Sequence, residues 1–174
     1  MAWEPLPDWV DKGPGLPDLL RARGYDIMQL DNRIYGSDAA AIAALAATYD
    51  PLPDAKAARL PLVDAELERR MHLPFRFNGV DFQVDPASQA KITAQGALAL
   101  ASLSNPATVP WPPGFCWIAA DNSRVAMDAA AMLSFAAAVA GHVGGLIFAA
   151  RARKDAILAL ASVAAVAAAD TADF

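Results

Sequence analysis

An uncharged run of 22 residues, at positions 129–150, constrains the fold of this chain more than any other feature. Asp128 directly precedes the run and supplies a helix cap, and alanine, the best helix former, follows at once. A helix over these residues is long enough to cross about 30 Å of hydrocarbon. The run therefore predicts either a membrane span or the central helix of a protein domain.

The amino-acid composition favours a helix within a protein domain over a membrane span. Alanine accounts for 42 of the 174 residues, and its single methyl group contributes little transfer free energy. Ser134 and His142 also fall inside the run. The basic residues that follow the run would suit a positive-inside flank, so a small membrane protein using 129–150 stays open as a less favoured alternative. We prefer a helix whose smooth face packs against another helix, in this chain or in a copy of it.

Two glycines mark the face of this helix that we expect to bind a partner. Gly141 and Gly145 form a GxxxG pair, and this spacing places both on one side of a helix. Without side chains at these positions, a second helix backbone can approach closely. The pair therefore predicts a partner-binding surface in a homo-oligomer, in which a trimer around the long helix is one arrangement.

Shorter signals predict the other elements. Asp85-Pro86 starts a helix with a capping carboxylate and a proline in the first turn. Asn78-Gly79 favours the tight turn of a β-hairpin, and we expect a second hairpin over 116–127 and a short one over 25–35. Pro61 should kink or split its helix near residues 59–60. Further helices are expected over 16–23, 39–48, 53–71, 86–104 and 163–169.

The predicted fold class is α+β, mainly α: two β-hairpins with alanine-rich packed helices, plus an extended Pro/Trp-rich N-terminal arm. Residues 74–104 and 115–160 each contain a hairpin, an aspartate cap and an alanine-rich helix. We therefore expect three parts, which are an arm over 1–36, a helical linker region over 37–72, and a hairpin-helix-hairpin-helix domain over 73–174.

The N-terminal arm combines prolines and glycines with large apolar side chains. Proline fixes φ and removes a donor, so the segment is unsuited to a long helix or a central strand. Disordered tails are usually poor in aromatic residues, which favours an arm that lies on a surface. We expect Trp3, Trp9, Leu16 and Leu20 to bind a partner protein, and the alternative is an arm that wraps back on its own domain.

Chemistry-bearing residues are sparse, and we expect no enzyme, no cofactor and no metal site. His72 and His142 lie far apart and outside any zinc-ligand spacing. Cys116 is the single cysteine, so no intrachain disulfide is possible. A nucleophilic role for it with His142 and Asp121 is disfavoured by its aromatic neighbours. The net charge of −5 argues against nucleic acid as a partner, and no secretory signal is evident.

Several segments together resemble a known family. The pattern comprises Tyr49-Asp50-Pro51-Leu52-Pro53, Phe77-Asn78-Gly79-Val80-Asp81-Phe82, Asp85-Pro86-Ala87-Ser88, Trp117-Ile118-Ala119-Ala120-Asp121-Asn122, and Ala150-Arg151-Ala152-Arg153-Lys154-Asp155-Ala156-Ile157. In order and spacing it resembles the uncharacterised alanine-rich domain of tail and tail-fibre-associated proteins in tailed bacteriophages and prophages. The resemblance covers residues 48–170, and the loop at 110–113 departs from it.

The resemblance implies a structural role in a virion. It implies a component of a phage tail, baseplate or tail-fibre complex, with other tail or baseplate proteins as partners. The chain would be made in the host cytoplasm and located in the virion tail. A tail-fibre assembly chaperone, absent from the mature particle, is the alternative. The resemblance brings no catalytic residues.

Overall fold

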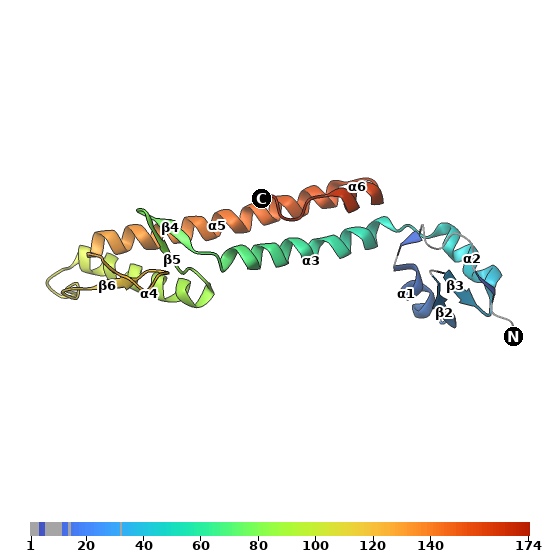
Figure 1. The fold of residues 1–174 in the computed structure, drawn as a ribbon, viewed down its shortest axis with the longest axis horizontal. Coiled ribbons are helices and arrows are strands. Elements are labelled where there is room, and N and C mark those ends of the chain that lie inside the picture. Colours follow the sequence, from blue (N-terminus) through green and yellow to red (C-terminus); the bar gives the residue numbers. More distant parts are fainter. Residues whose placement is uncertain (1–3, 6–11, 14, 32) are drawn as a thin grey trace. The chain divides into compact units, whose positions relative to one another are not determined.

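A computed structural model of the chain describes residues 4–5, 12–13, 15–31 and 33–174 (Figure 1). The fold is α+β and mainly α, as predicted, with alanine-rich helices and two-stranded hairpins. The chain divides into two compact units. Unit 1 contains the described residues up to Leu62 together with Lys154–Thr171, and unit 2 contains Val63–Arg153 and Ala172–Phe174.

Unit 1 begins with a small sheet and two helices. Strands β1 (Glu4–Pro5), β2 (Ile27–Leu30) and β3 (Arg33–Gly36) pair antiparallel in the order β1-β3-β2. Helix α1 (Gly15–Ala22) precedes β2, and α2 (Ala39–Thr48) follows β3. The carboxylate of Asp38 caps α2 by accepting from the N–H of Ala41 over 3.1 Å. The short hairpin and both helices occur where the sequence predicts them.

Three helical segments complete unit 1. They belong to α3 (Leu52–Met71), the end of α5 (Ala129–Ala159), and α6 (Val163–Ala168). The side chain of Arg59 donates to the carbonyl of Ala169 at 3.2 and 2.6 Å, which ties α3 to the end of α6. Ser162 caps α6 by accepting a hydrogen bond from the N–H of Ala165.

Unit 2 contains both predicted hairpins and their helices. Strands β4 (Phe75–Phe77) and β5 (Val80–Phe82) turn at Asn78-Gly79, and both turn residues have positive φ, at 49° and 82°. Asn and Gly tolerate this conformation best, which is why the dipeptide favours the turn. Helix α4 (Pro86–Ser104) follows, then β6 (Cys116–Ile118), β7 (Arg124–Ala126) and α5.

The core of unit 2 lies where the two hairpins meet α4 and α5. Phe135 of α5 is fully buried at its centre. Its ring centroid lies 4.6 Å from that of Phe82, 5.3 Å from Phe77 and 6.2 Å from Trp117. Aromatic residues of both hairpins therefore pack on one helical residue, and this contact joins the two hairpin-helix segments into one core.

The structure shows how α3 passes Pro61 and where the two compact units divide. Helix α3 continues through Pro61 from Leu52 to Met71, so the proline does not split it. The exposed ring removes one N–H from a helix of 20 residues, and the turns on both sides remain helical. The two units divide within α3 and within α5, whereas the sequence predicts boundaries after residues 36 and 72. Both helices are long enough to contribute to each unit.

Candidate interaction surface

Helix α5 has one face packed in the core of unit 2 and an opposite face that is open. Asp128 starts the helix, and its carboxylate accepts from the N–H of Ala131 over 2.7 Å. Met132, Phe135 and Val139 follow at spacings of three and four residues, and all three are buried in the core of unit 2. This spacing directs them to one face of the helix, as the 3.6-residue repeat requires.

The opposite face of α5 is open. A methyl group added at Gly141, Gly144 or Gly145 would meet no atom within 4 Å outside the neighbouring backbone of the helix. Phe148 lies one helical turn further along the same face, and 77% of it is exposed. We call Ala137, Gly141, Gly145 and Phe148 the α5 open face. The described part of the chain leaves this surface uncovered.

The GxxxG pattern predicts Gly141 and Gly145 on this face, but it does not include Phe148. The signal was available, because Phe148 lies seven residues after Gly141 and therefore shares its side of the helix. Only the structure shows that Phe148 is exposed rather than part of the core. An aromatic side chain beside small residues is a common feature of surfaces that bind proteins.

The close helix contact inside unit 2 occurs elsewhere. A methyl group added at Gly96 of α4 would lie 2.6 Å from the Cβ of Ala136, a residue of α5. Real Cβ atoms do not approach so closely, so the two backbones meet there because position 96 is glycine. A smooth face of α5 does press against a helix of its own chain, but at Ala136 rather than at Gly141 and Gly145.

The expected contacts of the N-terminal segment divide into two groups. Trp3 and Trp9 lie outside the described residues. Leu16 and Leu20 have no exposed surface, because both fill the core of unit 1 with Ile34. Leu16 and Leu20 therefore contact their own unit rather than a partner protein. This agrees with the alternative that the N-terminal segment folds back on its own chain.

The chemistry-bearing residues have structural partners. The ring of His142 stacks on Phe75 with centroids 4.7 Å apart, and Nδ1 of His72 lies 2.9 Å from the carbonyl oxygen of Glu68 on the surface. Cys116 is half-buried in β6. Asp121 accepts from the N–H of Ser123 over 2.9 Å, and hydrogen bonds from Ser123 lower the pKa of that carboxyl. Within the described ranges, no three His, Cys, Asp or Glu residues gather in a metal-binding arrangement.

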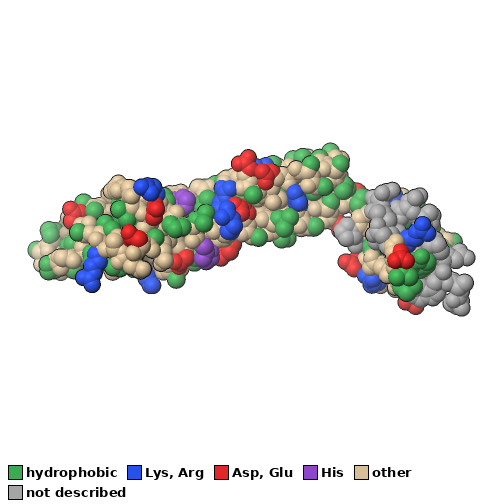
Figure 2. Space-filling view, viewed as in Figure 1, with side chains coloured by type: hydrophobic (Ala, Val, Ile, Leu, Met, Phe, Trp, Pro, Cys, Tyr) green, Lys and Arg blue, Asp and Glu red, His purple; other side chains and the backbone are tan. Residues whose placement is uncertain are grey.

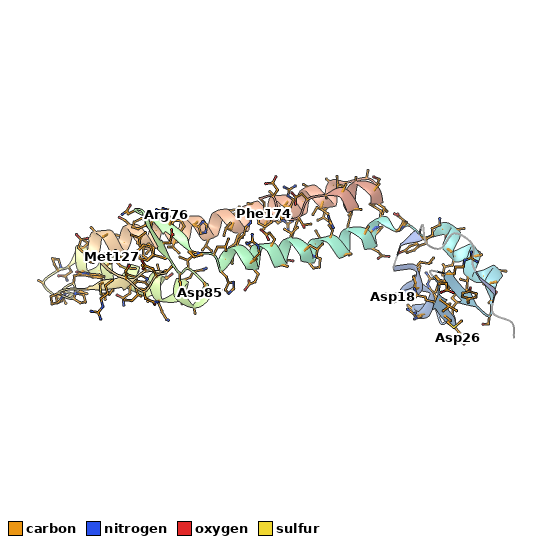
Figure 3. The ribbon with its side chains drawn as sticks, in the orientation of Figure 1. Asp18, Asp26, Arg76, Asp85, Met127 and Phe174 are labelled. Atoms are coloured by element: carbon orange, nitrogen blue, oxygen red, sulfur yellow. The ribbon has the colours of Figure 1, made fainter. Side chains whose placement is uncertain are left out.

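Charged residues near the end of α3 form a local network. The carboxylate of Glu66 accepts from Nε of Arg69 at 2.7 Å and from Nε of Arg70 at 2.8 Å. Hydrogen bonds from Arg69, and then from Arg70, lower the pKa of Glu66 to about 2. The guanidinium of Arg70 also lies 4.6 Å from the ring centroid of Phe174, whose position Figure 3 shows. On the face drawn in Figure 2, Lys and Arg are interspersed with Asp and Glu.

The membrane alternative depends on α5. Among the described residues, α5 is the one helix that is long and apolar enough to cross a membrane, and 17% of its most apolar 18-residue segment is buried. Its core face, however, carries the aromatic contacts with both hairpins. Insertion would separate these contacts and bring hairpin backbone groups into lipid, where unpaired groups are costly.

The chain matches a protein family over most of its length. Residues 54–173 match the family described as Domain of unknown function (DUF4376). The matched range spans all of α4 and both hairpins of unit 2, together with the α5 open face. No curated protein and no solved structure matches the chain.

Proposed function

The chain belongs to the DUF4376 family, and from this premise we propose that it is a structural component of a phage tail, baseplate or tail-fibre complex that acts through protein–protein assembly. The observation that carries the proposal is the α5 open face. It presents a flat surface of small residues beside a phenylalanine that is 77% exposed. The resemblance of residues 48–170 to tail-associated proteins supplies the phage context.

The geometry of the open face suits a helical partner. Helix axes lie about 8–10 Å apart when side chains separate them, and small residues allow the closer end of that range. Gly141 and Gly145 would let a partner helix approach, and Phe148 would provide the large apolar contact at one end. We propose a second copy of the chain as this partner, giving a homo-oligomer in which a trimer around α5 is one arrangement.

Mass spectrometry of purified virions tests the proposed role. Particles would be prepared from the phage or prophage that encodes the chain, and the infected cells would be sampled in parallel. We expect the chain in the particles at a fixed ratio to the tail proteins. Its presence in infected cells but absence from particles would instead identify an assembly chaperone.

A solubility test addresses the membrane alternative. The full chain would be expressed without detergent, and the supernatant would be analysed after ultracentrifugation. We expect the chain to remain in the supernatant, because the core face of α5 is already covered by the two hairpins. Recovery in the membrane fraction alone, with extraction by detergent, would contradict the proposed virion role.

A further inference from the structure

The two hairpins of unit 2 touch at the outer edges of two strands. The N–H of Ala120, just after β6, donates to the carbonyl of Asp81 in β5 over 2.8 Å. Beyond this bond β5 ends, and the chain turns into α4 at the capping residue Asp85, which Figure 3 labels. Among the described strands β6 pairs with β7 alone, so its other edge has no strand beside it.

The bonds between β6 and β7 use every second residue of β6. The N–H of Ala119 donates to the carbonyl of Ser123 over 3.0 Å, which fixes the alternation. Residues of an antiparallel strand direct their N–H and C=O groups to alternate edges. Trp117 therefore bonds to β7, while the backbone groups of Cys116 and Ile118 point to the opposite edge. Neither of these two residues has a backbone hydrogen bond there to any described residue.

A cavity of about 350 Å³ lies along this open edge. Its walls are β6 on one side and the start of α4 on the other, with Gln83 and Asn122 among the lining residues. The three residues of β6 span about 10 Å at the usual rise of a strand. The cavity therefore has the place and the length for a short extended segment that pairs with β6.

The charge of the cavity indicates what that segment carries. Lys91 lines the cavity, and no Asp or Glu is among the described residues that line it. Lys91 forms no ion pair with another described residue. A carboxylate on the bound segment would be placed beside this ammonium group, whereas a basic residue would be repelled.

We propose that β6 binds an extended, acidic segment of a partner protein by β-strand addition, in the cavity between β6 and α4. The open N–H and C=O groups of Cys116 and Ile118 pair with the backbone of the segment, and Lys91 pairs with an Asp or Glu side chain. Such strand addition derives affinity from the main chain and specificity from alternate side chains. The site is separate from the α5 open face and does not depend on the virion role.

Cys116 provides a built-in reporter for the test. It is the single cysteine of the chain and lines the cavity, so alkylation by iodoacetamide measures its accessibility. The probe is the acetylated and amidated peptide Thr-Val-Glu-Val-Thr, with fluorescence anisotropy of a labelled copy as the second measurement. Two control peptides carry Lys in place of Glu, or N-methyl groups on alternate amides, which remove the backbone donors. We expect protection of Cys116 by the Glu peptide alone.

Two variants test separately how backbone pairing with β6 and the charge of Lys91 contribute to peptide binding. Ile118→Pro removes one N–H at the open edge and no bond to β7, so the hairpin should survive while peptide protection is lost. Lys91→Glu should weaken binding of the Glu peptide by about twofold to fivefold and make the Lys peptide the better ligand. Arg23→Glu reverses an exposed charge in unit 1 and is the matched control. It should change neither the protection of Cys116 nor the preference for the Glu peptide.

Three results would overturn the proposal. Equal protection by the N-methylated peptide would show that backbone pairing with β6 is not involved. If Lys91→Glu still prefers the Glu peptide, Lys91 does not select an acidic segment, and that part of the proposal is wrong. Protection that appears without peptide as the protein concentration rises would identify a second copy of the chain, rather than a partner segment, as the occupant.

Discussion

Gly96 of α4 faces Ala136 of α5 so closely that a Cβ at position 96 would lie 2.6 Å from the Cβ of Ala136. The two alanine-rich helices of unit 2 thus meet at Gly96. The helix caps and hairpin turns in the sequence do not predict this contact. The glycines at 141 and 145, which form the evident sequence motif, face open space instead. Glycine therefore allows a close helix contact at position 96 and leaves an open surface at positions 141 and 145. Substitutions at these positions should have different effects.

We expect alanine substitutions at positions 96 and 141 to have opposite effects on stability. Gly141→Ala should stabilise the protein by about 0.5–1 kcal/mol, because alanine is the better helix former and the site is open. Gly96→Ala should destabilise it by about 1–3 kcal/mol through overpacking against Ala136. Urea denaturation at low protein concentration measures both. Equal effects of the two variants would show that the two sites have the same surroundings.

Larger changes on the α5 open face should alter assembly rather than folding. Gly141→Leu would hold a partner helix away, and Phe148→Ser would remove the exposed aromatic contact. Sedimentation equilibrium should show a lower oligomer mass for both, with circular dichroism unchanged. Ala156→Leu, an exposed position on α5 within unit 1, is the matched control. An unaltered mass in Gly141→Leu and Phe148→Ser would exclude this face as the interface.

Leu20→Ala should destabilise unit 1 by about 2–5 kcal/mol, because Leu20 has no exposed surface and its removal leaves a cavity. Leu30→Ala is the control, since half of that side chain is already exposed. Hydrogen exchange of residues 16–46 should speed up in Leu20→Ala only. A loss of partner binding without any change in exchange would instead support the contact role expected from the sequence.

The network at Glu66 predicts a stability that depends on pH. Its pKa is about 2 in the folded chain, below the value of about 4.3 for an unperturbed glutamate. The ion pairs with Arg69 and Arg70 therefore contribute fully above about pH 4.3 and lose their effect as the pH falls towards 2. Glu66→Gln should lower the melting temperature at pH 7 more than at pH 3.

Glu68→Gln is the control for this pH dependence, because the side chain of Glu68 is largely exposed and its ion pair with the exposed His72, at 3.6 Å, contributes little on the surface. We expect its melting temperature to follow that of the unmodified chain at both pH values. If Glu66→Gln has the same effect at pH 7 and pH 3, the carboxylate does not stabilise the fold by ionisation.

Local sequence signals determined the elements of this protein. Asp85 and Asp128 accept N–H bonds at the helix starts predicted from them, and the Asn78-Gly79 turn forms the predicted hairpin. Capping and turn formation involve residues within four positions of one another, so the chain encodes them without reference to distant segments. The mainly helical α+β class follows from these signals.

Only the tertiary structure decided which surfaces are covered. Leu16 and Leu20 look like contact residues in the sequence but are buried, whereas Phe148 looks like a core residue but is exposed. Likewise, the open edge of β6 depends on where the hairpin β4–β5 ends beside it. Burial is set by contacts between residues far apart in the chain, and hydrophobic attraction has no direction, so the residue type alone does not fix the partner.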